Sequence, residues 1–361
     1  MGDLLAGKSV AVVHEWFSAV GGSERVFLAL ADLVPHADRY VLWVEPDADV
    51  RGLGLRQTWL AHTPLRRSKV LALPIMPLVW RTVGRPAPDV VISSSHAFAH
   101  TVKLGDPAHT RHLSYVHLPA RYVWTPHVDH RGTGSLYAAP RRLLQAADRR
   151  GGRHVHAYAA ASHDVRRRIN RFWRRDAVVI NPPVDTDFFT PVREPSRDYL
   201  LGVGRWVPYK NFDLMIDVAQ AARMPLVLAG TGPEEARLRR RATDARVPVT
   251  FVSRPDADRL RTLYGNATAL LYPAHEDFGI TPVEAQACGT PVIGLRRGGL
   301  LETVIDGETG FLADALDPDA YVPLIRRADA LASGRIRRHA EQFSYARFAE
   351  RVTRWVDDAT R

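Results

Sequence analysis

Short runs of apolar and β-branched residues recur along the first half of the chain, and stretches with helical spacing separate them. Apolar residues recur at helical spacing over 24–34 and over 165–173. The runs themselves predict buried strands at 10–13, 40–44, 90–93, 112–116 and 155–159. Strand, helix and strand in this order imply right-handed crossovers, and therefore a parallel sheet.

A proline-rich stretch, residues 181–198, interrupts this pattern, and a second set of strands follows it. Asn211 is expected to cap a helix that runs to about residue 222, and Pro233 to take the first position of the next helix. The strands of the second half are predicted at 199–203, 226–229, 249–252, 269–272 and 292–294.

The fold class is thus α/β, with two doubly wound Rossmann-like domains that are expected to face each other across a cleft. The predicted boundaries are a first domain at 1–183, a linker at 184–198, a second domain at 199–340 and a C-terminal helix at 341–361 that packs back on the first domain.

Composition narrows the protein class. With one cysteine, Cys288, no intrachain disulfide can form and a thiolate metal cluster is excluded. Residues 1–9 lack the pattern of a signal peptide. The longest apolar stretch, 71–80, contains two prolines and is half the ~20 residues that span a bilayer. We therefore expect a soluble, cytoplasmic protein.

The net charge of +10 is concentrated in one region. Residues 131–175 hold twelve arginines and two acids, a surplus of ten, and such a patch attracts phosphates, anionic lipid or nucleic acid. The alternative is a solvated helix face. Because Arg66, Arg67 and Lys69 precede the apolar stretch 71–80, we also expect a basic, partly apolar face that can dock on an anionic membrane.

In open α/β sheets, ligands bind beyond the carboxyl ends of the strands, so the loops after strands are the candidate sites. Gly21 and Gly22 follow the first strand and open the first helix, where free N–H groups favour a phosphate. A plain tight turn is the alternative, and the spacing lacks the G-x-G-x-x-G of a dinucleotide fold.

The loop after the first strand of the second half contains two cations, Arg205 and Lys210. Fixed positive charges there would neutralise a diphosphate and stabilise the charge that develops on a departing nucleotide. The alternative is a pair of ordinary surface cations.

Two carboxylates, Glu276 and Glu284, follow another strand. Glu276 lies in a loop with no evident partner, where a carboxylate can select a sugar through its hydroxyls, and Gly279 permits close backbone approach. For Glu284 there is a structural alternative, because residues 281–284 read Thr-Pro-Val-Glu, a helix capping box.

These residues belong to a pattern that resembles the retaining glycosyltransferases of family four, which have the GT-B fold. The pattern comprises the two glutamates, separated by seven residues, Gly298-Gly299, and the stretch Asp306-Gly307-Glu308-Thr309-Gly310-Phe311-Leu312. Finer features resemble the branch of bacterial O-antigen mannosyltransferases. They are His14-Glu15-Trp16, Ser93-Ser94-Ser95-His96-Ala97, the stretch 115–124 and Pro182-Pro183-Val184-Asp185.

The resemblance assigns roles to particular residues of the second domain. It implies that Glu276 contacts the hydroxyls of the donor sugar and Glu284 the ribose. The remaining donor contacts would come from the backbone of Phe278, Gly279, Ile280 and Thr281 to sugar and phosphate, from Arg205 and Lys210 to the diphosphate, and from the region of Arg254 to the base. Ser253 departs from the family, which commonly has glycine there.

In the first domain, the resemblance implies that the Gly21-Gly22 backbone closes over the diphosphate and that His117 lies near the reacting centre. A buried structural histidine is the alternative for His117.

The implied reaction is transfer of a hexose, with retention of configuration, from a nucleotide sugar to a glycan or lipid-linked acceptor in cell-surface polysaccharide or glycoconjugate synthesis. GDP-mannose is the first candidate donor, and the implied front-face displacement requires neither a metal ion nor a cofactor. Peripheral attachment to the inner face of the plasma membrane is a hypothesis, and no nucleic-acid partner is expected. The alternatives are a sugar-nucleotide epimerase of the same architecture and, ranked last, a basic nucleic-acid-binding module.

Overall fold

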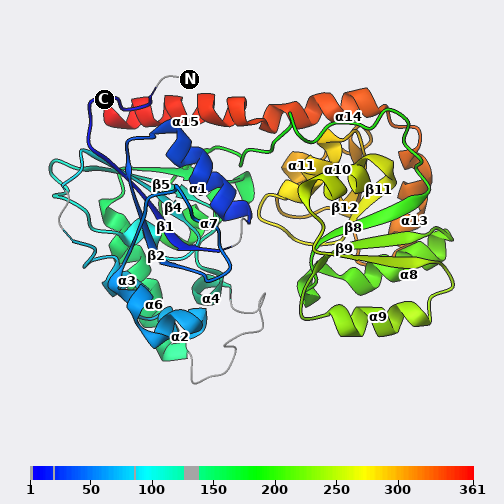
Figure 1. The fold of residues 1–361 in the computed structure, drawn as a ribbon, viewed down its shortest axis with the longest axis horizontal. Coiled ribbons are helices and arrows are strands. Elements are labelled where there is room, and N and C mark those ends of the chain that lie inside the picture. Colours follow the sequence, from blue (N-terminus) through cyan, green and yellow to red (C-terminus); the bar gives the residue numbers. More distant parts are fainter. Residues whose placement is uncertain (1–2, 19–20, 85–86, 126–137) are drawn as a thin grey trace. The chain divides into compact units, whose positions relative to one another are not determined.

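The computed structural model describes residues 3–18, 21–84, 87–125 and 138–361, and these residues form two compact units. Unit 1 comprises residues 1–183 and 346–361, and unit 2 comprises residues 184–345. Each unit is an α/β layer structure around its own sheet (Figure 1).

The sheet of unit 1 has seven parallel strands in the order β3-β2-β1-β4-β5-β6-β7. The strands are β1 (Val10–Phe17), β2 (Asp38–Val44), β3 (Leu55–Gln57), β4 (Val90–Ser95), β5 (Arg111–Val116), β6 (Ala157–Ala160) and β7 (Val178–Val179). Every residue of β1 and β4 is buried, as expected of central strands covered on both faces.

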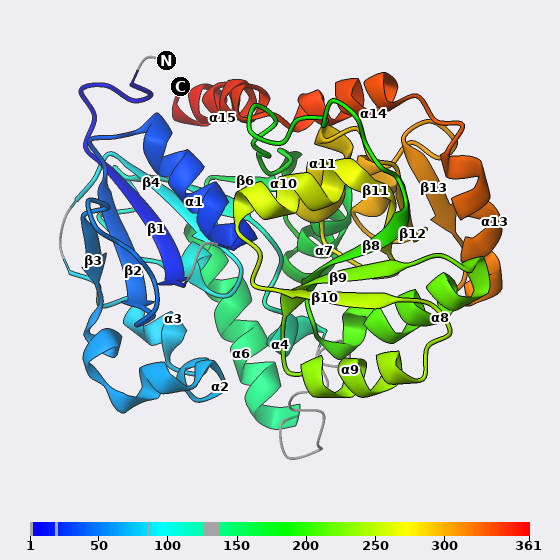
Figure 2. The same ribbon diagram turned by 45° about the vertical axis from the view of Figure 1, so that its right-hand side comes forward.

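Helices cover both faces of this sheet, with α1 on one side and α3 and α6 on the other (Figures 1 and 2). The helices of unit 1 are α1 (Gly22–Leu33), α2 (Lys69–Ala72), α3 (Met76–Val79), α4 (Arg121–Trp124), α6 (Ala138–Gly151), α7 (His163–Trp173) and α15 (Tyr345–Thr360). Met76, Val79 and Trp80 pack with the side chains of β1 and β2 in one core, so half of the apolar stretch 71–80 is buried.

Unit 2 has six parallel strands in the order β10-β9-β8-β11-β12-β13. They are β8 (Tyr199–Arg205), β9 (Leu226–Thr231), β10 (Val249–Ser253), β11 (Ala267–Tyr272), β12 (Val292–Leu295) and β13 (Gly310–Ala313). The helices are α8 (Phe212–Ala222), α9 (Glu235–Thr243), α10 (Ala257–Asn266), α11 (Ile280–Ala287), α12 (Leu300–Thr303), α13 (Pro318–Ala328) and α14 (Ser333–Ala340).

Successive residues of these strands contribute to two different cores, because side chains alternate between the faces of a sheet. Leu200 packs with α8 and α13 on one face, whereas Leu201 packs with α10 and α11 on the other. Since both cores are apolar, the strands read as continuous hydrophobic runs, and this is why the sequence pattern located them.

In both units the strand order reverses beside the first strand, so both are doubly wound parallel sheets of the Rossmann type. The predicted fold class, α/β with two doubly wound Rossmann-like domains, is therefore confirmed. The predicted linker, 184–198, lies within unit 2: Phe189 is buried in its core, and the Arg337 guanidinium donates to the carbonyl of Thr186 at 2.7 Å. Residues 346–360 of α15 belong to unit 1, where Phe348 contacts Tyr115.

Two predicted helix starts are wrong in detail. Asn211 precedes α8, but its φ is +53° and its side chain makes no capping hydrogen bond; its amide instead donates to the carbonyl of Pro273 at 2.7 Å. α9 begins at Glu235, so Pro233 lies in the preceding turn and not at the first helical position. For Asn211 the reason is the contact with Pro273, which follows β11, and a local pattern cannot show such a contact.

Candidate functional site

In unit 2, the strand order reverses between β8 and β11, and the loops that follow these two strands contribute a buried charge pair. Lys210 Nζ lies 2.9 Å from Glu276 Oε1 and 3.2 Å from the hydroxyl of Tyr272. The side chains of Lys210 and Glu276 are only 13% and 16% exposed. The structure thus brings together two residues that the sequence analysis singled out separately, and it provides Glu276 with a partner that the sequence did not show.

The charge of Lys210 is maintained by its neighbours. Burial alone would lower its pKa, but the Glu276 carboxylate, followed by the hydroxyls of Tyr272 and Tyr209, raises that pKa above its ordinary value. Burial also raises the pKa of Tyr272, which keeps its hydroxyl protonated. The site therefore offers a fixed ammonium group in a largely dry environment, where its electrostatic effect is stronger than in water.

Close approach of backbone segments shapes this site. Gly204, at the end of β8, has φ +145°, and a Cβ there would lie 3.1 Å from Lys210 Nζ. Gly298 follows β12, and a Cβ there would lie 2.3 Å from the carbonyl oxygen of Glu276. Side chains at these positions would push Lys210 or the Glu276 loop out of place.

The helix after the Glu276 loop starts earlier than the capping box predicts. α11 begins at Ile280, after Gly279 with φ +96°, and no side chain caps it. Thr281 is therefore inside the helix, and the capping-box alternative for Glu284 is wrong. The buried Glu284 carboxylate accepts a hydrogen bond from the Tyr264 hydroxyl at 2.9 Å, while Phe278 is buried in the core.

Two further residues predicted to contact the donor, Arg205 and Arg254, form no hydrogen bond or ion pair with Lys210 or Glu276. Arg205 is exposed at the end of β8, and its guanidinium forms no hydrogen bond or ion pair with any described residue. Arg254 is exposed after β10, with φ +49°, and its N–H donates to the Gly230 carbonyl at 3.0 Å. The adjacent Ser253 hydroxyl lies 3.4 Å from Glu235.

In unit 1, the carboxyl ends of β1, β4 and β5 carry a buried cluster of polar side chains around Glu15. The Glu15 carboxylate accepts hydrogen bonds from the N–H groups of Ala97 and Ala99, both at 2.8 Å, and from the Ser95 hydroxyl at 3.2 Å. His96 lies against the same carboxylate, with Nδ1 at 3.1 Å from Oε2.

His117 follows β5 and is 8% exposed. Its Nε2 lies 2.8 Å from the hydroxyl of Ser94, and its ring contacts His14 and His96 edge-on. The Cα partner of Ser94 in the ladder between β1 and β4 is His14, so the register of the sheet places these residues side by side.

The three histidines of this cluster differ in their protonation. Burial lowers the pKa of His14 to about 4 and, together with His96 and His14, lowers that of His117 well below the usual value. Burial would lower the pKa of His96 too, but Glu15 outweighs it and raises that pKa. His96 and Glu15 therefore form the ion pair, while His14 and His117 stay neutral near pH 7.

His14, Glu15 and His96 place nitrogen and oxygen atoms within 4.8 Å of one another, close enough for a metal ion. However, both oxygens of Glu15 already accept hydrogen bonds from the protein, so the carboxylate acts as an anchor for the loop after β4. This favours a structural role for the trio.

Gly21 and Gly22 lie where the sequence analysis expected them, at the start of α1. Gly21 has an extended backbone, and the first turn contains the buried Glu24, which accepts from the hydroxyls of Ser18 and Ser23 at 2.5 and 2.9 Å. A carboxylate at the helix N-terminus is favourable for the helix dipole and would compete with a phosphate there.

Sequence reasoning did not assign roles to Glu15, Ser94 and His96, although all three belong to stretches quoted for the O-antigen resemblance. Glu15 and His96 are eighty-one positions apart, and only the pairing of β1 with β4 brings them together. A charged residue inside an otherwise apolar strand was the available signal, because a carboxylate is seldom fully buried without partners.

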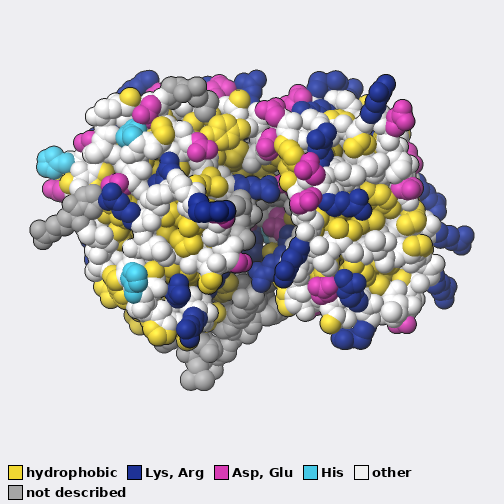
Figure 3. All heavy atoms as spheres, viewed as in Figure 1, with side chains coloured by type: hydrophobic (Ala, Val, Ile, Leu, Met, Phe, Trp, Pro, Cys, Tyr) yellow, Lys and Arg dark blue, Asp and Glu magenta, His cyan; other side chains and the backbone are white. Residues whose placement is uncertain are grey.

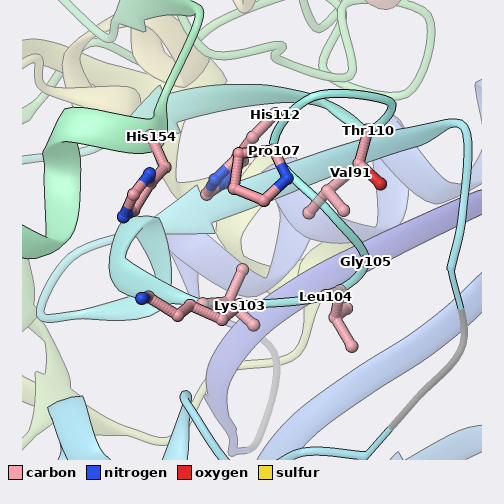
Figure 4. Close-up of a pocket in the computed structure, with 9 residues that line it drawn as sticks. Val91, Lys103, Leu104, Gly105, Pro107, Thr110, His112 and His154 are labelled. Atoms are coloured by element: carbon pink, nitrogen blue, oxygen red, sulfur yellow. The ribbon is translucent and has the colours of Figure 1, made fainter.

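A separate cavity of about 270 Å³ lies at the amino ends of the strands in unit 1, opposite to the ends that carry the polar cluster (Figure 4). Val91 and His112 belong to the first residues of β4 and β5, whereas Ser94 and His117 lie at or beyond the other ends of these strands. Lys103 and His154 also line this cavity. It is therefore distinct from the polar cluster around Glu15.

Acidic neighbours neutralise part of the predicted basic region. Arg166 pairs with Asp176 at 2.9 Å, and Arg167 and Arg168 both pair with Asp164. Residues 131–137 of the region lie outside the described part of the chain. Among the described helices, none combines the length and hydropathy needed to cross a bilayer.

Residues 184–358, just under half of the chain, match the family described as Glycosyl transferases group 1. The D-inositol 3-phosphate glycosyltransferase of Mycolicibacterium smegmatis is 33% identical over 46% of this chain and 44% of its own length. The GDP-mannose-dependent alpha-(1-6)-phosphatidylinositol monomannoside mannosyltransferase of the same organism is 33% identical over 43% of this chain and 47% of its own. The chain thus spans less than half the length of these curated relatives.

Solved structures share the fold over nearly the whole chain. HepE of Anabaena in complex with UDP and glucose superposes with a TM-score of 0.71 at 16% identity, covering 96% of this chain and 99% of HepE. Sucrose-phosphate synthase of Thermosynechococcus elongatus gives 0.70 at 19% identity, covering 96% and 98%. These similarities support the GT-B architecture for the two units.

Proposed function

We propose that this chain is a glycosyltransferase whose unit 2 binds a nucleotide sugar and whose unit 1 carries the acceptor side of the reaction. The observation that carries the proposal is the buried pair of Lys210 and Glu276 at the switch point of unit 2, inside the segment that matches glycosyl transferases group 1. A cation suits the diphosphate of a sugar nucleotide, and a carboxylate suits the hydroxyls of its sugar.

In this proposal, the chain acts mainly through electrostatics and positioning. Lys210 neutralises the diphosphate and stabilises the negative charge that the departing nucleoside diphosphate gains in the transition state. Glu276 accepts hydrogen bonds from the sugar, and Glu284, held by Tyr264, takes the ribose. The α11 N-terminus, where the N–H groups of Gly279 and Ile280 donate to no described residue, adds positive potential for the phosphates.

We further propose retention of anomeric configuration, with the leaving phosphate assisting deprotonation of the acceptor. The support is the family resemblance of the motifs around Glu276 and Glu284. Product stereochemistry by NMR tests this: an α-linked product from an α-linked donor is expected, and inversion would reject the retaining assignment.

GDP-mannose is the first donor to test, and UDP-glucose is its competitor. The name of the mycobacterial mannosyltransferase supports the former, and the UDP and glucose bound to HepE support the latter. The first acceptors to test are lipid-linked glycans, in keeping with the motifs that resemble the O-antigen mannosyltransferases. Transfer of radiolabelled sugar to a lipid-linked acceptor supports the proposal, whereas release of an altered free sugar without acceptor would indicate an epimerase.

The structure adds support for the membrane-docking hypothesis. Leu71 on α2 and Leu78 on α3 are 64% and 57% exposed, and Arg66 and Arg67 lie in the preceding turn, unpaired with any described residue. Exposed hydrophobic side chains lie beside Lys and Arg side chains at the end of unit 1 that carries α2 (Figure 3). Lys69 contributes less, because it pairs with Glu45 at 3.3 Å.

Flotation with liposomes tests this docking face. We expect the chain to float with phosphatidylglycerol vesicles more than with phosphatidylcholine vesicles, and the variant Leu71→Ser/Leu78→Ser to lose that preference. Leu301→Ser, a change of a leucine in unit 2 that is 50% exposed, is the control and should float as the wild type does. Equal flotation with both kinds of vesicle would reject the hypothesis.

A further inference from the structure

A hydrogen-bonded chain of three side chains runs through the polar cluster of unit 1. Nδ1 of His14 lies 3.1 Å from both the carbonyl oxygen and the hydroxyl of Ser94, and that hydroxyl lies 2.8 Å from Nε2 of His117. His14 and Ser94 are fully buried, so water does not compete for these bonds. Only a few arrangements of the protons on His14, Ser94 and His117 are therefore compatible with these hydrogen bonds.

The carbonyl oxygen of Ser94 determines the direction of the bonds. A carbonyl oxygen can only accept, so Nδ1 of His14 must carry the proton that it shares with this oxygen and the Ser94 hydroxyl. The hydroxyl accepts from His14 and has its own proton left to donate. Its remaining neighbour is Nε2 of His117, which must therefore accept.

A neutral imidazole that accepts at Nε2 carries its proton at Nδ1. No described residue bonds to Nδ1 of His117, so this N–H group is available to a ligand. We propose that Ser94 is a positioning residue: it fixes the ring of His117 and holds it in the Nδ1–H tautomer, so that His117 offers a ligand a neutral hydrogen-bond donor.

This assignment restricts what His117 can do in the reaction, a step that rests on the proposed glycosyltransferase function. With Nε2 occupied by Ser94 and Nδ1 protonated, the ring has no free lone pair for a proton from the acceptor hydroxyl. His117 can donate to an oxygen of the sugar phosphate or the acceptor, but it does not act as a general base. Burial and the positive charge of the neighbouring His96, which is paired with Glu15, lower the pKa of His117 and favour its neutral form.

The tautomer can be measured directly on the full chain. With ¹⁵N-labelled histidine, two-bond ¹H–¹⁵N correlation spectra distinguish protonated from unprotonated ring nitrogens, and His117→Gln identifies the signals of His117. We expect Nδ1 to be protonated and Nε2 unprotonated in the wild type. Ser94→Ala should change this pattern to the Nε2–H form or to an average of both, and Ser94→Thr, which keeps a hydroxyl, should preserve it.

Ser93→Ala is the matched control, since Ser93 is the neighbouring residue of β4 and its hydroxyl contacts His112 instead, at 2.9 Å. It should alter the signals of His112 and leave those of His117 unchanged. The proposal is overturned if wild-type His117 is protonated at Nε2, or if Ser94→Ala, folded as judged by its other histidine signals, leaves the pattern of His117 intact. Should Ser94→Ala not fold, the wild-type spectrum and Ser94→Thr still decide the question.

Kinetics provide a second readout. We expect Ser94→Ala to lower kcat roughly 10- to 100-fold, with little change in the KM for the nucleotide sugar. An effect of this size corresponds to the loss of one hydrogen bond from His117 to a charged phosphate oxygen. Ser94→Thr should restore kcat. The spectra need no activity, so failure to find any sugar donor would reject the proposed function and leave the tautomer assignment standing. Conversely, an active enzyme with the other tautomer would reject the role of Ser94 alone.

Discussion

At the scale of single residues, Lys210 and Glu276 are largely buried side chains of opposite charge, and each charge is compensated by the other. Removing one partner of such a pair leaves a buried charge without compensation, which commonly costs about 3–5 kcal/mol. Because both side chains remain slightly exposed, at 13% and 16%, the cost here should lie at or below the lower end of that range. Under the proposed function, recognition of the donor and stability of the fold are therefore linked at this site.

We expect Glu276→Gln to lower the rate of sugar transfer by roughly 100-fold or more, the usual effect of losing one preorganised polar group at a reacting centre. The melting temperature should also fall, since Lys210 loses its counter-charge. Transfer assays and thermal unfolding monitored by circular dichroism measure both effects. Glu235→Gln, which removes a partly exposed carboxylate paired with Arg239, is the control and should change neither property. Near-normal transfer by Glu276→Gln would contradict the role of Glu276.

The free energy of unfolding should depend on pH through the buried His112. Burial lowers the pKa of His112 to about 3, whereas an unfolded histidine has a pKa near 6.5. Between these values the unfolded chain binds the extra proton, so the free energy of unfolding falls as the pH drops from 6.5 towards 3, by about a few kcal/mol from this group. Urea unfolding at pH 7, 6 and 5 measures this free energy. We expect it to fall less steeply with decreasing pH in His112→Gln than in the wild type.

The exposed His109→Gln is the control for this series, and its decline with pH should parallel that of the wild type. Parallel curves for His112→Gln and the wild type would show that His112 does not hold its proton differently in the folded chain.

At the scale of elements, the apolar pattern located every central strand of both sheets, because those strands are covered on both faces. It did not find the short edge strands β3 and β7, whose residues are partly exposed, or β13, which begins inside the glycine-containing motif 306–312. Edge strands bury less and so leave a weaker pattern in the sequence.

Helix starts were predicted less well than strands. At Asn211 and Gly279 the residue before the helix has a positive φ and no side-chain cap, so the usual capping rules do not apply. Both positions lie at the carboxyl edge of the sheet in unit 2, where Asn211 bonds to Pro273 and Gly279 precedes α11. Tertiary contacts have replaced local capping where a ligand is proposed to bind.

A glycine at the end of β8 provides a test at this scale. Gly204 has φ +145°, and a Cβ there would press on Lys210, so Gly204→Ala should weaken binding of the nucleotide sugar at least tenfold and lower the melting temperature. Gly54→Ala, at φ +60° with open space around it, carries backbone strain without that contact and should leave binding unchanged. Fluorescence titration measures the affinities; equal affinity of Gly204→Ala and wild type would contradict the proposed position of the diphosphate.

At the scale of the whole molecule, the two sheets have the same order of their first six strands. Each sheet carries polar side chains at the carboxyl ends of its strands: the cluster around Glu15 in unit 1, and Lys210 with Glu276 in unit 2. In unit 2 the sequence singled out both members of the charge pair, because Lys210 and Glu276 each follow a strand in a recognisable motif. In unit 1 it identified His117 but not the network around Glu15, which depends on the pairing of β1 with β4 across some eighty residues. Strand register is what single-sequence patterns fail to supply.

The most direct test of the central claim is calorimetric titration of the full chain with GDP-, UDP-, ADP- and TDP-sugars. We expect at least one of them to bind with a dissociation constant between about 1 μM and 1 mM, the usual range for enzyme substrates. Lys210→Gln should weaken that binding at least tenfold, whereas Lys103→Gln, a change of an exposed lysine in unit 1, should not. Absence of binding heat with all four sugar nucleotides, or equal affinity in wild type and Lys210→Gln, would contradict the claim that Lys210 and Glu276 form the donor site.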